Sequence, residues 1–352
     1  MKIRYLLLGL VIAAACLYFT FRNVPFNDVY QSLKDFNYVY LPAAIALFAL
    51  FFVFRAYRWH YLCRTVKVIP VRRFYSPIMI GFMANLMSSR IGEFIRAYLL
   101  GNREKMTFSA SLATVVVDRL FDMIALLAMF AGLLILNPTV FVPQGSEKSA
   151  QIAAAVKTSG IGSLVLCIGL IIFCYLLVHK KEMTYKVVGV FTRFLPDKIK
   201  SRIDDILNSF SSGLGVLRDP KGILWSILLS ALIWGSMLLV NYPIYYCYNI
   251  ESALPFSSLV TLLVVTGAAI AVMPTPGYLG PFQLAITFVL ADIYGIDKGI
   301  AASFSLVTWF LQNVGIVLAG LIFMFRDNES IFQLSRTAKA AADQAGEPDP
   351  LK

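Results

Sequence analysis

The sequence predicts an all-α, polytopic membrane protein with about six full transmembrane helices and two re-entrant helical hairpins that enter from opposite faces. Hydrophobic residues make up 59% of the 352 residues and charged residues only 14%, which is far more apolar than one soluble core requires. The apolar residues form long runs, and most basic residues fall between these runs. The net charge of +11 therefore indicates membrane orientation and an anionic lipid surface, and we expect no nucleic-acid partner.

Several runs are long enough to cross a bilayer, which takes about 20 residues of helix. The predicted full spans are residues 5–21, 39–60, 109–136, 156–178, 223–248 and 300–325. They form one membrane domain over residues 1–326, and residues 327–352 are predicted to be a polar, disordered tail.

Two further segments, 76–100 and 256–295, fit a single crossing poorly. Lys2 and Arg4 place the N-terminus in the cytoplasm, because cytoplasmic loops carry the excess of basic residues. A single crossing by residues 76–100 would put the most basic loop, 179–221, outside. Re-entrant hairpins at both segments instead place this loop and both termini in the cytoplasm. Arg73 and Met106 should then lie on the same side, and we expect the cytoplasmic (inner) membrane of a bacterium.

The basic loop 179–221 contains an amphipathic pattern. Apolar residues from Ile199 to Leu217 recur at spacings of three and four, with lysine and arginine nearby. This pattern predicts a helix that lies on the anionic inner leaflet, or one that packs against the membrane domain. Asp204 and Asp205, in the same loop, are the only hint of a metal-nucleotide site.

The first hairpin carries ionisable residues in an apolar stretch. Arg90, Glu93 and Arg96 follow a predicted turn near Asn85 to Ser89 and fan across one side of the returning half-helix. Intramembrane charges are candidates for a functional site. The alternative is that they pair with one another near the headgroups and reach toward water.

Two further groups of charges lie in predicted spans. Asp118 and Asp122 share one helical face, with Arg119 beside them, and form either part of a substrate site or a structural ion pair. Arg55 and Arg58, at the cytoplasmic end of the second span, are interpreted as interfacial anchors beside the aromatic belt, and the alternative is that they belong to a functional site.

The second hairpin is rich in proline and glycine. Pro274 and Pro276 cannot both continue a helix, while Gly277 and Gly280 permit a tight turn. Pro281 suits the first turn of a returning half-helix, whose N-terminus could receive an anion. A purely structural kink is the alternative.

Three stretches carry a family resemblance: "NLMSSRIGEFIRAYLL", "VVVDRLFDMIAL" and "MPTPGYLGPFQLAITFVLADIYGI". In order and spacing they resemble the signature regions of the lysylphosphatidylglycerol synthase transmembrane-region family of flippase-like proteins, over nearly all of residues 1–325. The first motif is matched at Asn85, Arg90, Gly92, Glu93 and Arg96, with Ser89 near its usual proline. Asp118 and Arg119 stand where Glu-Arg is common. Gln283 stands where a glutamate is frequent, which puts a proton-carrying role there in doubt.

The resemblance implies translocation of a lipid with an anionic or modified headgroup, a phospholipid or polyprenyl-linked lipid, between leaflets. The predicted hinge residues are Pro274, Pro276 and Pro281. The predicted substrate-binding residues are Asn85, Arg90, Glu93, Arg96, Asp118, Arg119, Asp122, Gly277, Gly280 and Gln283.

We expect no enzymatic activity, cofactor or metal. Relatives with synthase activity add a soluble aminoacyl-transferase domain, where this chain has only its short tail. The sequence contains no Walker A motif, and its histidines, His60 and His179, have no metal-like spacing. The alternatives are a membrane-embedded transferase acting on a lipid-linked sugar and an accessory protein of an envelope-lipid pathway. A homo-oligomer or a lipid-synthesis enzyme partner also remains open.

Overall fold

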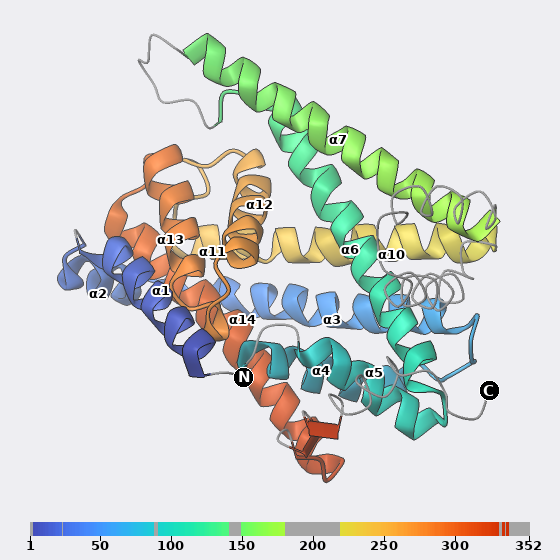
Figure 1. Ribbon diagram of the computed structural model, residues 1–352. Helices are drawn as coiled ribbons and strands as arrows, with labels where there is room; N and C mark the ends of the chain where they lie inside the picture. The colour runs from blue at the N-terminus through green and yellow to red at the C-terminus, as the bar shows by residue number, and fades with distance from the viewer. Residues whose placement is uncertain are drawn as a thin grey trace.

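The computed structural model describes residues 3–22, 24–87, 91–140, 149–179, 219–330, 333–334 and 336–337. Within these ranges every regular element is a helix and there is no strand (Figure 1). Five described segments are long and apolar enough to cross a membrane. They are Tyr38–Cys63, Phe108–Leu136, Ala154–Phe173, Lys221–Cys247 and Lys298–Arg326. The predicted polytopic helical architecture is therefore confirmed.

Three of the long helices start at a residue whose side chain caps them. The Thr107 side chain accepts a hydrogen bond from the Ala110 N–H at 3.3 Å, and Asp219 and Asp297 cap their helices in the same way. Such caps satisfy N–H groups that lack a partner in the first turn. The helices that match predicted spans are α3 (Leu41–Cys63), α6 (Phe108–Leu136), α7 (Ser149–His179), α10 (Pro220–Leu239) with α11 (Asn241–Cys247), and α14 (Lys298–Arg326).

The predicted N-terminal span at residues 5–21 is only part of the helical segment that the structure has there. Helix α1 (Ile3–Phe21) is followed by a second helix, α2 (Phe26–Lys34), at an angle of 79° to its Gly9–Phe21 part. Pro25 stands at the N-cap of α2, where its fixed φ of −61° suits a helix start. Together the two helices form a sixth, bent candidate span.

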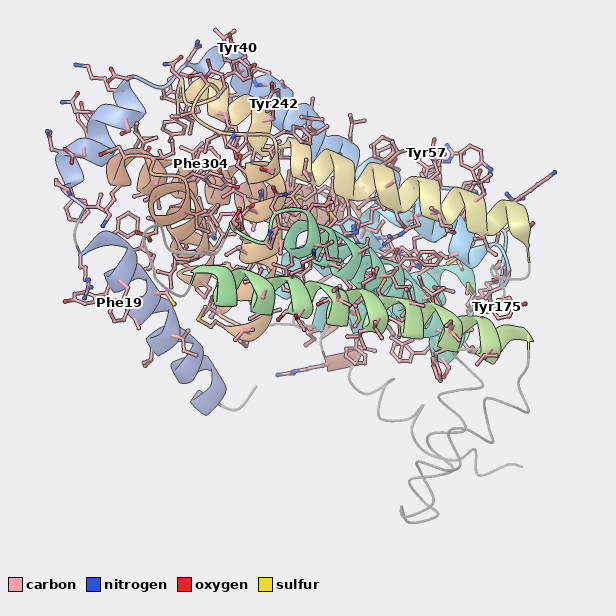
Figure 2. All side chains as sticks on the ribbon, turned by 90° about the horizontal axis from the view of Figure 1, so that it is seen from above. Phe19, Tyr40, Tyr57, Tyr175, Tyr242 and Phe304 are labelled. Atoms are coloured by element: carbon pink, nitrogen blue, oxygen red, sulfur yellow. The ribbon has the colours of Figure 1, made fainter. Side chains whose placement is uncertain are left out.

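The helices pack around one large apolar core. Helices α3 and α10 lie side by side and antiparallel, α6 packs against both, and α7 lies along α6 (Figure 1). Aromatic side chains fill the interior and also mark the periphery. Phe304 lies inside, whereas Tyr40 and Tyr242 lie near one end of the α3 and α10 pair and Tyr57 nearer the other (Figure 2). Tyrosines near both ends suit the two interfaces of a bilayer.

The first broken segment is a helical hairpin of α4 (Arg72–Met87) and α5 (Ile91–Glu104). The two helices pack antiparallel, and their outer ends meet where Arg73 pairs with Glu104 at 2.7 Å. Residues near Arg73 and Met106 therefore lie at the same end of the bundle, as the hairpin prediction requires. Arg103 pairs with Asp327 at 2.7 Å, which joins this end to the C-terminus of α14.

The second broken segment folds back at the opposite end of the bundle. It comprises α12 (Ser257–Val272), a 3₁₀ turn η3 (Pro276–Tyr278), α13 (Pro281–Thr287) and a π-helix η4 (Phe288–Ile293). Its outer ends meet where the hydroxyls of Thr261 and Tyr294 lie 3.1 Å apart, near the start of α14. The turn η3 contacts α4, so the two broken segments approach each other inside the bundle.

Two predicted features fall outside the described residues. The amphipathic helix between Ile199 and Leu217 is one, and most of the polar tail at 327–352 is the other. Both remain predictions.

Gly92 lets α4 and α5 approach closely, and we expect Gly92→Ala to destabilise the hairpin by about 3 kcal/mol, since overpacking strains the backbone. A Cβ at Gly92 would collide with the Gly81 carbonyl oxygen and come within 2.6 Å of Asn85 Oδ1. The measurement is the thermal unfolding midpoint of the purified protein in detergent. Gly132→Ala in α6 is the matched control, because a Cβ there meets nothing within 4 Å. Equal midpoints for the two variants would contradict the close approach.

Candidate functional site

A cluster of ionisable side chains lies inside the bundle, between α3, α5 and α6. We call it the charged cluster. Its described members comprise four arginines and three carboxylates, which leave one formal positive charge. They are Arg55, Arg58, Glu93, Arg96, Asp118, Arg119 and Asp122.

Asp118 is the centre of the charged cluster. Its side chain is fully buried and contacts Arg58 at 2.8 Å and both Arg96 and Arg119 at 3.3 Å. The Arg58 guanidinium also reaches Asp122 at 2.7 Å and the Ser230 hydroxyl at 3.0 Å. One buried carboxylate thus ties together arginines from three helices.

The interpretation of Arg55 and Arg58 as interfacial anchors is wrong. Both are buried, and Arg55 pairs with Asp122 at 2.8 Å while Arg58 bridges Asp118 and Asp122. Their spacing of three residues places both on the face of α3 that packs against α6. Asp118 and Asp122, four residues apart, likewise share one face of α6. Two such faces of opposite charge were the signal in the sequence that could have paired these arginines with these aspartates.

Arg96 is enclosed by its partners. It is fully buried, contacts Glu93 at 3.2 Å, and its guanidinium carbon lies 4.4 Å from the centre of the Trp59 ring. A cation over an aromatic face is stabilised by the ring quadrupole. Arg96 is therefore placed to hold the arrangement together, and its role as a direct donor to substrate remains a prediction.

Asn85 fastens the hairpin beside the charged cluster. Its Oδ1 accepts a hydrogen bond from the Gly92 N–H at 2.8 Å, and its Nδ2 donates to Glu93 Oε1 at 3.2 Å. The position of Glu93 is thus fixed from α4. Arg90, predicted with the same group, lies outside the described residues.

Arg119 and Glu93 form the accessible edge of the charged cluster. Their side chains are 31% and 19% exposed, whereas those of Arg55, Arg58, Arg96, Asp118 and Asp122 are 8% exposed or less. Arg119 lies 3.3 to 3.4 Å from Glu93, Asp118 and Asp122. The turn η3, which contains Tyr278, contacts α4, and Asn85 of α4 donates a hydrogen bond to Glu93. The second broken segment therefore approaches the part of the bundle that holds this edge.

The predicted substrate-binding residues of the second broken segment form and stabilise its turn. Gly280 has φ of 94° and packs so closely on α1 that a Cβ would come within 2.7 Å of the Ala13 carbonyl oxygen. Its N–H donates to Gln283 Oε1 at 2.7 Å, and the Gly277 carbonyl accepts from Trp309 Nε1 at 2.8 Å. These contacts stabilise the turn. Gly277, Gly280 and Gln283 are therefore not members of the charged cluster.

The prolines interrupt the helix as predicted. Residues Pro274 and Pro276 lie between α12 and the end of η3, and Pro281 is the first residue of α13. The break is therefore real, while a role for these prolines as a moving hinge remains a prediction. In the described part of the chain, no group of three or more His, Cys, Asp or Glu residues is arranged to hold a metal ion.

Comparison with known proteins shows that the chain is similar to several membrane proteins of archaea. A UPF0104 membrane protein of Methanothermobacter thermautotrophicus is 24% identical over 306 residues, which cover 82% of this chain and 87% of that protein. One from Methanocaldococcus jannaschii is 23% identical over 258 residues, covering 73% of this chain and 99% of that protein. The glycosyltransferase AglD of Haloferax volcanii is 20% identical over 326 residues, which cover 87% of this chain but 51% of that protein.

No solved structure matches this chain. The profile of one family, described as the lysylphosphatidylglycerol synthase TM region, matches residues 6–320, which include the charged cluster and both broken segments. The chain therefore belongs to the family of the lysylphosphatidylglycerol synthase transmembrane region.

Proposed function

We propose that this protein moves a lipid with an anionic or modified headgroup, a phospholipid or a polyprenyl-linked lipid, from one membrane leaflet to the other. A phosphate cannot cross hydrocarbon without a partner, because burying an unpaired ion costs several kcal/mol or more. Membership of the transmembrane-region family supports the proposal. The observation that carries it is the accessible arginine of the charged cluster.

Arg119 has hydrogen-bonding capacity left over. Its Nε lies 3.4 Å from Glu93 Oε2 but makes no hydrogen bond with any described residue. The Nε atoms of Arg55 and Arg96 are unbonded as well, but those side chains are 3% exposed or less. The contacts of Arg119 with carboxylates are 3.3 Å or longer, whereas Arg55 and Arg58 have contacts of 2.7 to 2.8 Å. Arg96 has contacts of 3.2 and 3.3 Å but is fully buried, while the side chain of Arg119 is 31% exposed. A guanidinium has five N–H donors and suits bidentate binding of phosphate. Arg119 is thus the arginine from which a headgroup phosphate displaces a partner most easily.

The position of Arg119 suits a headgroup in transit. It lies about 17 Å along α6 from Phe108. We take Phe108, the first residue of this candidate span, as the edge of the hydrocarbon core, which puts Arg119 close to the middle of a core of about 30 Å. The neighbouring arginines and carboxylates neutralise one another, so the surplus positive charge is available to the phosphate. In this proposal Glu93 releases Arg119 when the lipid arrives and pairs with it again when the lipid leaves.

We propose further that the chain works without enzymatic activity in a bacterial cytoplasmic membrane, with both termini in the cytoplasm. One end of the bundle gathers Lys67, Arg72, Arg73, Arg103 and Arg326, which supports a cytoplasmic location for that end. The relatives described above are archaeal, and the bacterial source is part of this proposal. The proposal also includes a homo-oligomer or a lipid-synthesis enzyme as a partner.

A membrane-embedded transferase acting on a lipid-linked sugar is the alternative. It is favoured by the relative whose name is glycosyltransferase AglD, of which this chain spans about half. Asp204 and Asp205, the residues that would hold a donor nucleotide, lie outside the described residues.

The two functions are separated by reconstituting the full chain in liposomes. A leaflet-resolved assay with headgroup-labelled anionic phospholipid, zwitterionic phospholipid and polyprenyl phosphate is expected to show faster translocation than in protein-free liposomes. Rates equal to those of protein-free liposomes for every lipid would overturn the proposal. A parallel incubation with a polyprenyl-linked sugar and an acceptor tests the alternative, because only a transferase releases a glycosylated product.

A further inference from the structure

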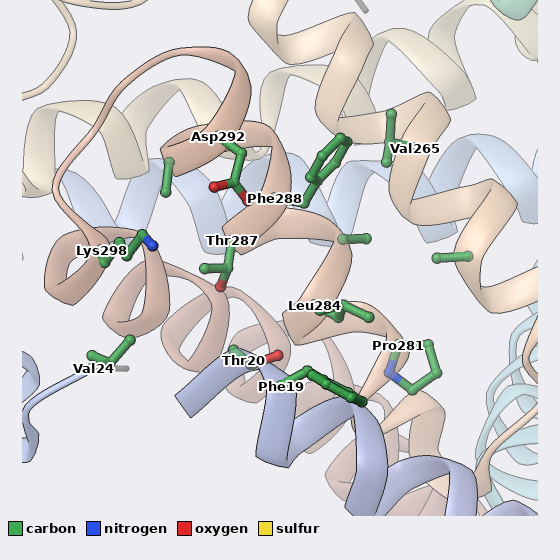
Figure 3. A pocket seen from close by; sticks show the side chains of 13 residues that line it. Phe19, Thr20, Val24, Val265, Pro281, Leu284, Thr287, Phe288, Asp292 and Lys298 are labelled. Atoms are coloured by element: carbon green, nitrogen blue, oxygen red, sulfur yellow. The ribbon is translucent and has the colours of Figure 1, made fainter. Parts of the chain in front are cut away.

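A second site lies away from the charged cluster, in a pocket between α1, α12, α13, η4 and the start of α14 (Figure 3). Its volume is about 350 Å³. Apolar side chains of Phe19, Val265, Leu284 and Phe288 form most of its lining. Asp292 and Lys298 also line it, so the pocket is amphipathic.

The dimensions of the pocket match one leaflet of a bilayer. Its lining begins at Pro281, which follows the turn inside the bundle, and extends along α13 and η4 to Asp292. The eleven helical steps from Pro281 to Asp292 rise about 17 Å, roughly half of a 30 Å hydrocarbon core. An acyl chain of one leaflet therefore has an apolar wall of suitable length.

The Thr287 hydroxyl lacks a hydrogen-bond partner in the pocket. Thr287 is only 8% exposed and lines the pocket, and its Oγ1 is buried with no hydrogen-bond partner among the described residues. On the opposite wall, Thr20 is satisfied by the Cys16 carbonyl at 2.8 Å. An unsatisfied buried hydroxyl costs about 1–3 kcal/mol, so a ligand that bonds it is favoured. Figure 3 shows Thr287 between the charged and the apolar parts of the lining.

The charges at the pocket's outer end are of both signs. Asp292 and Lys298 are exposed, and neither forms an ion pair with another described residue. Figure 3 shows Asp292 above Thr287 and Lys298 to its left. Separated charges of opposite sign complement a headgroup that carries phosphate and ammonium together. The π-helix that presents Asp292 is a rare element that occurs frequently at functional sites.

We infer that this pocket binds one phospholipid with a zwitterionic headgroup. The acyl chain lies along Leu284 and Phe288, the phosphate binds Lys298, and the ammonium binds Asp292. A headgroup or glycerol oxygen accepts a hydrogen bond from Thr287. This inference is independent of the proposed translocation, because it concerns binding at a site outside the charged cluster.

The test is lipid binding to the purified full chain, measured by native mass spectrometry against a phosphatidylethanolamine, a phosphatidylglycerol and a diacylglycerol of equal chain length. We expect phosphatidylethanolamine to bind most tightly, phosphatidylglycerol less tightly and diacylglycerol most weakly. Ala269→Trp fills the pocket and is expected to weaken phosphatidylethanolamine binding about tenfold. Val272→Trp, on the same helix but 78% exposed, is the matched control and should leave binding unchanged.

The charge variants separate a headgroup site from a general apolar groove. Lys298→Gln should weaken both phospholipids, whereas Asp292→Asn should weaken phosphatidylethanolamine alone and so remove the preference. Unfolding midpoints near that of the wild type establish that each variant is folded. The inference fails if diacylglycerol binds as well as the phospholipids, if phosphatidylglycerol is preferred, or if Ala269→Trp binds like Val272→Trp.

Discussion

Asp118→Asn is expected to lower the free energy of unfolding by about 3–5 kcal/mol, the usual cost of removing one partner from a buried ion pair. The substitution keeps the shape of the side chain but removes its charge. Four arginines would then face two carboxylates in a low dielectric, and Arg58, Arg96 and Arg119 would each lose a charged partner. The thermal unfolding midpoint in detergent measures the effect.

Asp35→Asn is the control for this prediction. Asp35 is exposed at the C-cap of α2 and makes no ion pair with another described residue. A similar, small change in midpoint for both variants would mean that the charged cluster does not stabilise the bundle.

The fold was largely predictable because membrane helices leave a strong signal. Apolar runs of about 20 residues identify spans, and the distribution of basic residues identified the segments that do not cross singly. The bend after α1 was missed, since Pro25 opens a short polar helix where the residues also suited a loop. Boundaries of this kind depend on packing against α14 as well as on local sequence.

The charged cluster was only partly predictable. Asp118, Arg119 and Asp122 were identified because charges in an apolar span are conspicuous. The arginines of α3 were misassigned, because Arg55 and Arg58 lie near enough to a helix end to pass for interfacial anchors. Only the packing of α3 on α6 brings partners 60 or more residues apart in sequence into contact. The pocket beside η4 was not predicted, since its lining comes from separate helices.

Arg119→Gln is expected to slow lipid translocation about tenfold to a hundredfold while leaving the fold intact. A charge-assisted hydrogen bond contributes about 1.5–3 kcal/mol, and each 1.36 kcal/mol changes a rate tenfold. Stability should fall less than for Asp118→Asn, because three arginines then face three carboxylates. Translocation rate and unfolding midpoint are measured on the same preparation. Arg58 cannot serve as the control, since it is fully buried between two aspartates.

The most direct test of the central claim is the leaflet-resolved translocation rate of headgroup-labelled anionic phospholipid by the wild type, Arg119→Gln and Arg64→Gln. Arg64 is exposed at the C-terminal end of α3, over the Tyr61 ring, and is not part of the charged cluster. Liposomes must contain equal amounts of folded protein. We predict a wild-type rate for Arg64→Gln and a rate at least about tenfold lower for Arg119→Gln. A wild-type rate for a folded Arg119→Gln variant would contradict the claim and leave the charged cluster a purely structural role.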